Sequence, residues 1–245
     1  MIRRRRLLLA LTGFATLTYE IAWTRVFALT AGPSTYAFAA TLATVIAGIA
    51  IGSVVGAARA SRTRSPALML AITLILAAAA AAWAGSLAGS TLPRAFAASL
   101  AKAPQDFASL QWQRTWLMAA LIGPTAVGLG IAFPLALQLA GGRETAKRIG
   151  LVYALNTLCA VAGSLATGFL AIPWLGLQHT LFLATGALIV SALLLTAFGR
   201  LSIRIRALLA GPAIALLVWL VFQPPWDRDL LASGVYKYAP FAGEQ

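Results

Sequence analysis

Charged residues are scarce in this sequence, and most of those present are basic. Asp, Glu, Lys and Arg make up 10% of the 245 residues, with 19 basic against 6 acidic side chains, whereas a soluble domain averages about 25% charged residues. A chain with so few charges cannot cover itself with a polar shell, so most of its surface is expected to face lipid. The net charge of +13 does not indicate nucleic-acid binding, because the cations stand in short clusters between apolar runs. Such clusters typically flank membrane spans.

Acidic residues, histidine and cysteine are too few for a conventional catalytic or metal centre. The chain holds one cysteine, Cys159, and one histidine, His179. This excludes an intrachain disulfide and any multi-cysteine metal site, and no carboxylate pair, Cys/His cluster or Ser/His/Asp set can be assembled. A P-loop and a strand-linked Gly-x-Gly-x-x-Gly are also missing. We therefore predict no catalytic residue, no cofactor-binding residue and no metal ligand in this chain.

Long apolar runs are what the sequence has in abundance. About 20 apolar residues cross the ~30 Å of hydrocarbon in a bilayer. Because lipid offers no hydrogen-bond partners, the backbone of such a run must pair within itself and forms a helix. We predict an all-α integral membrane protein, a polytopic bundle of about seven transmembrane helices within residues 1–222. The spans are expected at 7–29, 35–58, 67–91, 116–140, 149–175, 180–198 and 205–222, of which the last is the shortest.

The basic residues orient these predicted spans. Loops on one side carry thirteen Lys and Arg residues, whereas the other side carries Arg94, Lys102 and Arg114, all in one longer loop. Basic loops stay in the cytoplasm, so the N-terminus is predicted to be cytoplasmic, and seven spans place the tail, 223–245, outside. The long loop, 92–115, is either a short helix on the outer surface or an ordered connector.

Glu20 is an ionisable residue inside the first predicted span. It lies ~20 Å along the helix axis from Arg6 and shares one face with Thr12, Thr16 and Thr24, which recur at a spacing of four. A lone charge at this depth costs at least ~2.5–3.5 kcal/mol on insertion scales, so it should face protein or water, be paired, or be protonated. Two interpretations stay open: Glu20 belongs to a polar or proton-linked pathway, or it is a polar residue that packs helices.

Arg25, Tyr153 and Asn156 complete the candidate intramembrane polar site. Arg25 lies near the outer end of the first span, where its side chain can reach the interface, but five residues from Glu20 it is poorly placed to pair with it along one helix. Tyr153 and Asn156 lie in the fifth span. Asn156 is expected to bond Glu20 or a backbone carbonyl, or to link two helices.

Small residues at a spacing of four predict two helix seams, because they let backbones approach closely in lipid. The second span carries Gly48, Gly52 and Gly56, and the fifth carries Ala160, Ser164 and Gly168. In addition, Gly52-Ser53 and Gly163-Ser164 occupy similar places 111 residues apart. This similarity suggests that spans one to three and four to six are inverted repeats, as in many transporters.

Five segments in chain order carry a family resemblance: YEIAWTR at 19–25, the run to AGIAIGS at 47–53, FPLAL at 133–137, LVYALNTLCAVAGSLATGF at 151–169 and LLASGVYKYA at 230–239. Together they resemble the membrane region of bacterial fused transporter-like (MFS-like)/spermidine synthase proteins. The resemblance implies a multi-span region in the bacterial inner membrane, followed by a soluble aminopropyltransferase-like domain with a Rossmann-like fold. That domain would use decarboxylated S-adenosylmethionine and a polyamine such as putrescine. Cys159 stands where the family more often has glycine.

The tail, 223–245, resembles only the beginning of such a soluble domain. Six residues follow Ala239, so the family's glycine-rich nucleoside-binding loop and acidic catalytic residues have no counterpart, and we expect the catalytic domain to act in cis or in trans. An S-adenosyl substrate in the cytoplasm would require either that one segment, first of all 205–222, does not span, or that the domain acts outside on another substrate. The implied function is to anchor, and to supply with substrate, a spermidine synthase-like enzyme. The alternatives are a transporter of a small cationic or zwitterionic solute and a structural membrane subunit.

Overall fold

The computed structural model describes residues 2–102, 106–141, 146–199 and 201–234, and within these ranges the chain forms helices and no strand. The elements are α1 (Ile2–Thr30), α2 (Thr35–Ala60), α3 (Pro66–Ala88), α4 (Thr91–Lys102), α5 (Phe107–Gly141), α6 (Ala146–Ala166), the π-helix η1 (Thr167–Ala171), α7 (Ile172–Phe198), α8 (Ile203–Val221) and α9 (Arg228–Ala232). The all-α prediction is confirmed. Apart from a few residues at their ends, six of the seven predicted spans lie on one helix each, whereas the fifth, 149–175, runs from α6 through η1 into α7.

Local chemistry explains where the helices begin and end. Gly32 adopts a positive φ of 93° between α1 and α2, and the Ser34 hydroxyl caps α2 by accepting a hydrogen bond of 3.2 Å from the Ala37 N–H. No loop separates the predicted fifth and sixth spans. The chain reverses direction inside α7 at Gly176, whose φ of 78° and ψ of 170° are not helical. A side chain at this position would be strained, so glycine permits the reversal.

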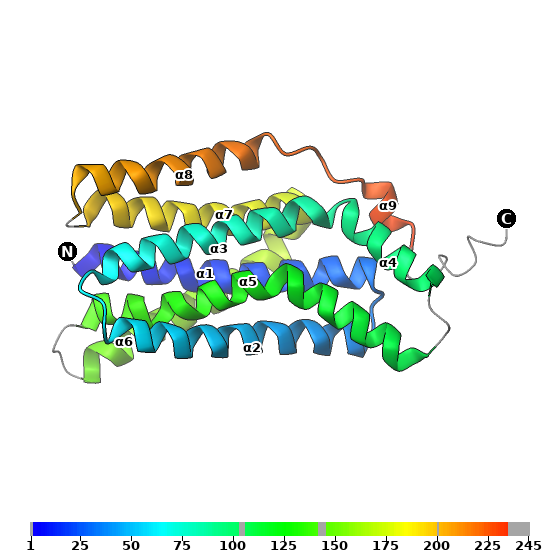
Figure 1. The fold of residues 1–245 in the computed structure, drawn as a ribbon, viewed down its shortest axis with the longest axis horizontal. Coiled ribbons are helices and arrows are strands. Elements are labelled where there is room, and N and C mark those ends of the chain that lie inside the picture. Colours follow the sequence, from blue (N-terminus) through cyan, green and yellow to red (C-terminus); the bar gives the residue numbers. More distant parts are fainter. Residues whose placement is uncertain (1, 103–105, 142–145, 200, 235–245) are drawn as a thin grey trace.

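Among the residues that the structure describes, five stretches are long and apolar enough to cross a membrane: Thr35–Ala60, Pro66–Ala88, Phe107–Leu139, Tyr153–Phe198 and Ile203–Val221. The fourth stretch has 46 residues and contains two antiparallel arms, α6 with η1 and α7 beyond Gly176 (Figure 1). Large apolar side chains lie exposed on the outside of the bundle, among them Phe169, Trp174, Val221 and Phe222. An exposed apolar surface of this kind is typical of a membrane or protein interface.

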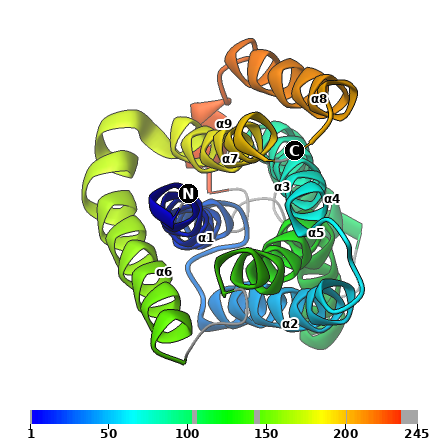
Figure 2. The ribbon, with the colours of Figure 1, turned by 90° about the vertical axis from the view of Figure 1, so that its left-hand side faces the viewer.

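Helix α1 lies in the middle of the bundle, and α2, α3, α5, α6 and α7 surround it (Figure 2). The main pairings are α2 with α5, α1 with α6, α3 with α5, α1 with α7, and α3 with α7. Exchanging α1, α2 and α3 for α5, α6 and α7 turns α2–α5 into α1–α6 and α3–α5 into α1–α7, and leaves α3–α7 as it is. Figure 1 shows α1 and α5 running in opposite directions. The packing thus agrees with the predicted inverted repeat, and α8 lies outside it.

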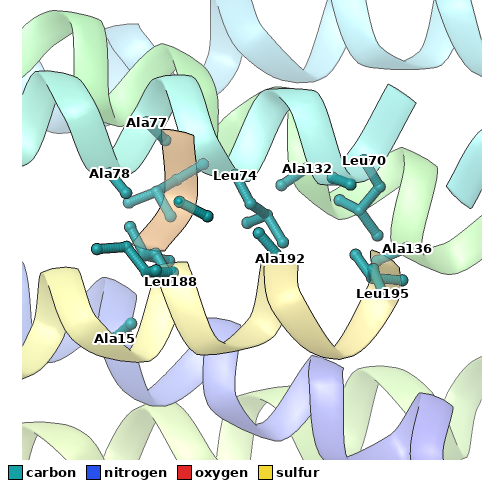
Figure 3. Close-up of a cluster of buried hydrophobic side chains, with 14 of the residues drawn as sticks. Ala15, Leu70, Leu74, Ala77, Ala78, Ala132, Ala136, Leu188, Ala192 and Leu195 are labelled. Atoms are coloured by element: carbon teal, nitrogen blue, oxygen red, sulfur yellow. The ribbon is translucent and has the colours of Figure 1, made fainter. Parts of the chain in front are cut away.

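The core has two apolar clusters that are rich in alanine. One lies between α3, α5, α7 and α8, where Leu70, Leu74, Leu188 and Leu195 pack among small residues (Figure 3). The other gathers around Trp23 of α1 and includes Leu92 and Phe96 of α4. Phe96 is fully buried, so the helical alternative for the long loop is right and α4 packs against the end of the bundle.

Candidate functional site

A cavity of about 170 Å³ opens where α1, α2, α5 and α6 meet. Its lining residues are Thr12, Gly13, Thr16 and Leu17 of α1, Ile49 of α2, Leu129, Ala132 and Phe133 of α5, and Asn156 and Ala160 of α6. Ile49 and Ala160 are 111 residues apart, like Gly52 and Gly163. The cavity therefore lies where the two halves of the repeat face each other, which is where inverted-repeat transporters place substrate sites.

The polar face of α1 continues from this cavity past Glu20. The Thr16 hydroxyl donates to the Thr12 carbonyl oxygen at 2.8 Å, and the Thr24 hydroxyl donates to the Glu20 carbonyl oxygen at 2.9 Å. These bonds satisfy the two threonines within their own helix. The Glu20 carboxylate is half-buried, and within the described part of the chain it has neither a hydrogen-bond nor an ion-pair partner.

A second cavity, of about 300 Å³, lies at the end of the α1–α2 hairpin. It is lined by Thr24, Phe27 and Ala28 of α1, by the turn from Gly32 to Ser34, and by the start of α2. Glu20 is one turn from Thr16 in the first cavity and one turn from Thr24 in the second. Glu20 itself lines neither cavity, but on α1 it lies between a residue of the cavity in the middle of the bundle and a residue of the cavity at its end.

The other candidate polar residues separate into two groups. Asn156 lines the first cavity, and a Cβ on Gly13 would lie 2.5 Å from its carbonyl oxygen and 2.7 Å from its side-chain Oδ1. Arg25 is exposed, and no ion pair joins it to Glu20 among the described residues. Tyr153 is 61% exposed and makes an edge contact with Phe133 at 6.2 Å between ring centroids. The structure thus brings Asn156 to the face of α1 that carries Thr12 and Thr16. Arg25 and Tyr153 do not line the first cavity.

The first predicted seam lies against α5. Gly48, Gly52 and Gly56 are all buried, and a Cβ on Gly48 would lie 2.6 Å from the Cβ of Ala126. A Cβ on Gly52 would collide with the carbonyl oxygen of Val127, and one on Gly56 would lie 2.7 Å from the Ile131 carbonyl oxygen. The backbones of α2 and α5 therefore touch along three turns.

The second predicted seam needs a correction. Ala160 lies at the first cavity, but a Cβ on Gly168 would meet nothing within 4 Å, and the close contact with α1 is made by Gly163, whose Cβ would lie 2.5 Å from the Phe14 carbonyl oxygen. The physical reason is that a row with a spacing of four turns by about 40° at each step. Ala160, Ser164 and Gly168 therefore drift away from α1, and Gly163 takes the contact.

Two parts of this region escaped the sequence analysis. The Tyr19 hydroxyl donates to Thr125 Oγ1 at 3.2 Å, and both side chains are buried; the residues are 106 positions apart, and no sequence pattern joins them. The π-helix η1 was also missed, although the nearby Pro173, which has no N–H, is the kind of residue that disturbs a helical ladder. Single π-turns within α-helices occur often at functional sites.

The segment after α8 folds back onto the end of the bundle. The Trp226 N–H donates to Gln178 Oε1 at 2.9 Å, Gln178 Nε2 donates to the Pro224 carbonyl oxygen at 2.7 Å, and Trp226 Nε1 donates to the Gly85 carbonyl oxygen at 3.1 Å. A cavity of about 510 Å³ lies beside this clasp, between α7 and α8. The clasp holds α9 at the same end of the bundle as α4 (Figure 1).

The described residues contain no group of three or more His, Cys, Asp and Glu side chains that could hold a metal ion. The comparisons with known proteins add no family: no family model matches the chain, and neither a curated protein nor a solved structure matches it.

Proposed function

We propose that this chain is the membrane domain of a spermidine synthase-like protein of the bacterial inner membrane, and that it binds a small organic cation of the polyamine class at Glu20. The observation that carries the proposal is the free, half-buried Glu20 carboxylate, which lies on a threonine face between two cavities. Even a half-buried carboxylate has lost part of its hydration and gains nothing in return without a partner, so we infer a ligand of opposite charge.

The groups that line the first cavity suit an extended diamine whose one end reaches Glu20, one turn of α1 beyond Thr16. An ammonium group pairs with Glu20, while the Asn156 side-chain oxygen and the threonine hydroxyls accept hydrogen bonds from a second nitrogen. Leu17, Ile49 and Leu129 offer apolar walls to the methylene groups between them. The fixed carboxylate and amide provide orientation, and the apolar lining provides burial, as in most small-molecule sites.

Seven spans are part of the proposal. Helix α1 and the two arms of Tyr153–Phe198 join the four other apolar helices, and the basic clusters put the N-terminal end of the bundle in the cytoplasm. Reporter fusions after Arg64, Lys147 and Arg204 should then report the cytoplasm, and a fusion after Lys102 should report the outside. A cytoplasmic signal at Lys102 would contradict this topology.

The aminopropyl transfer itself is assigned to the soluble domain, in cis or in trans, that the resemblance implies. Glu20 lies in the middle of α1, whereas Asp106 precedes α5, and Asp227 and Asp229 belong to the clasped segment. These carboxylates do not converge on one site that could hold decarboxylated S-adenosylmethionine and an amine together. The membrane domain would anchor the enzyme and deliver the polyamine to it.

Transport of the same cation across the membrane is the second candidate, and the two-fold relation of the helix pairings favours it. Both functions need the same site, so flux of labelled putrescine into proteoliposomes separates them. Uptake that requires Glu20 supports a transporter, whereas binding without uptake supports a domain that only captures the polyamine.

Equilibrium binding of radiolabelled putrescine to the purified protein in detergent tests the site. We expect saturable binding to the wild type and at least a tenfold loss in Glu20→Gln, because a charge-assisted hydrogen bond is worth about 1.5–3 kcal/mol. Asp229→Asn removes an exposed carboxylate of α9 and serves as the matched control, with unchanged binding expected. Equal affinity of Glu20→Gln and the wild type would refute the proposed site.

A further inference from the structure

Two buried threonine hydroxyls lie at the interface of α1 with α6 and η1, on the side of α1 away from Glu20. The side chains of Thr18 and Thr167 are 0% and 1% exposed, and neither hydroxyl has a hydrogen-bond partner in the described part of the chain. A buried hydroxyl without a partner costs about 1–3 kcal/mol. Two of them at one interface suggest that a ligand belongs there.

Several other buried threonines in the described helices donate to a carbonyl oxygen of their own helix. Thr30, Thr41 and Thr185 are equally buried, and each donates to the carbonyl oxygen four residues earlier at 2.8–3.0 Å. Thr18 and Thr167 make no such bond. The difference therefore lies in the surroundings of these two residues and not in the residue type.

The carbonyl groups four residues before Thr18 and Thr167 belong to the same backbone contact. They are those of Phe14 and Gly163, and a Cβ on Gly163 would lie 2.5 Å from the Phe14 carbonyl oxygen and 3.0 Å from the Phe14 Cα. Because α1 and α6 run in the same direction (Figure 1), Thr18 and Thr167 both lie one turn beyond this closest approach. The two free hydroxyls thus come from opposite sides of one interface.

A backbone carbonyl loses its usual donors at the same place. The Ile172 N–H bonds the Thr167 carbonyl oxygen, five residues earlier, instead of the Gly168 oxygen that it would reach in an α-helix. The alternative, π-helical donor for Gly168 is residue 173, which is proline and has no N–H. The Gly168 carbonyl therefore has neither its α-helical nor its π-helical partner.

We propose that Thr18, Thr167 and the Gly168 carbonyl are ligands of a bound sodium ion at the α1–η1 junction. Hard cations take oxygen ligands, and a set of neutral oxygens matches a single positive charge. Disturbed helical turns that release carbonyl groups coordinate sodium in membrane proteins with inverted repeats. When a threonine oxygen binds the ion, its proton is free to be donated to the Phe14 or Gly163 carbonyl.

Thermal unfolding of the purified full chain in detergent tests the site, with NaCl, KCl and N-methylglucamine chloride at equal ionic strength. At about ten times the Kd, sodium should raise the unfolding midpoint by roughly 3–5 °C over both other salts. Thr18→Val and Thr167→Val keep the side-chain shape and remove the oxygen, so each should abolish the sodium-specific shift. Thr167→Ser keeps the hydroxyl and should retain it.

Thr185→Val is the matched control, because Thr185 is buried but bonded within its own helix, and its sodium-specific shift should equal that of the wild type. Binding of ²²Na⁺ to the wild type gives a second readout that needs no variant, and saturable binding resistant to excess KCl is expected. Equal midpoints in NaCl and KCl, a shift that persists in both valine variants, or no ²²Na⁺ binding would overturn the assignment, the last in favour of a buried water.

Discussion

The α2–α5 seam and the α1–α6 seam are equivalent under the inverted repeat, yet they are built differently. Along α2–α5, Gly48 faces Ala126 and Gln138 Nε2 donates to the Ala60 carbonyl oxygen at 2.7 Å, so the two helices keep one register of 78 residues from end to end. Ser53 also finds a partner there, the Gly130 carbonyl oxygen at 3.4 Å. This seam is continuous, and its polar groups are paired.

Along the α1–α6 seam, the close backbone contacts of glycines lie at Gly13 and Gly163, and the seam opens into the cavity beside Asn156. It also contains the unpaired hydroxyls of Thr18 and Thr167 and passes into the π-helix η1. A seam whose polar groups have no protein partner is less stable than one whose groups are paired. The comparison indicates that α2–α5 is the more tightly packed seam, while α1–α6 is the one at which we propose the polyamine and sodium sites.

Gly52→Leu should have the largest effect, because it breaks the closed seam. Its Cβ would collide with the Val127 carbonyl oxygen and lie 3.0 Å from the Gly130 Cα, so the two backbones must separate. We expect a loss of roughly 3 kcal/mol or more in unfolding free energy, seen as a collapse in the yield of monodisperse protein. Ile51→Leu changes a neighbouring side chain that is 59% exposed and should leave the yield unchanged; equal yields of the two variants would place the seam elsewhere.

Gly13→Ala should have an intermediate effect, because it adds a methyl group at the more open seam. The new Cβ would lie 2.7 Å from Asn156 Oδ1, a side-chain atom that can move, and 2.5 Å from the Asn156 carbonyl oxygen, which cannot move as easily. A loss of about 1–3 kcal/mol in thermal or denaturant unfolding is expected.

Gly186→Ala is the matched control for Gly13→Ala. Gly186 lies inside α7, and its Cβ would meet nothing within 4 Å. Alanine is favoured over glycine in a helix by up to ~1 kcal/mol, so this variant should be as stable as the wild type or slightly more stable. If Gly13→Ala were as harmless as Gly186→Ala, α1 and α6 would not be in contact at Asn156.

Tyr19→Phe should have the smallest effect. It removes one buried hydrogen bond, from the Tyr19 hydroxyl to Thr125 Oγ1, and keeps the ring contact with Trp23 at 6.0 Å between centroids. About 1 kcal/mol should be lost. In a double-mutant cycle with Thr125→Val, the second substitution should cost little once the first is made; fully additive losses would mean that the bond does not form.

The sequence predicted the positions of the helices well. A long apolar run in lipid must pair its backbone N–H and C=O groups within itself, so it forms a helix whatever it packs against. The sequence did not predict which face of α6 meets α1, so Gly168 was chosen where Gly163 makes the contact. The contact face depends on how α6 is rotated about its axis. Residues at a spacing of four stay on one face for only one or two turns. The hydrogen bond from Trp226 to Gly85 joins residues 141 positions apart, and no local sequence pattern predicts it.

For the site, the sequence identified Glu20 and Asn156 because polar residues in apolar runs are conspicuous. It missed Thr18 and Thr167, since a threonine in a membrane helix is ordinary until its hydroxyl is found without a partner. Their role depends on a backbone contact, Phe14 with Gly163, between helices that are far apart in the chain.

The central claim is that Glu20 is retained for a ligand and not for packing. Its most direct test is the unfolding midpoint of the wild type and Glu20→Gln, each measured with and without putrescine. Without putrescine the variant should be as stable as the wild type or more stable, because a free buried carboxylate is removed. At ten times the wild-type Kd, putrescine should stabilise the wild type by about 1.4 kcal/mol and the variant by about 0.4 kcal/mol at most. A variant that is destabilised without putrescine, and that gains as much from it as the wild type, would contradict the account.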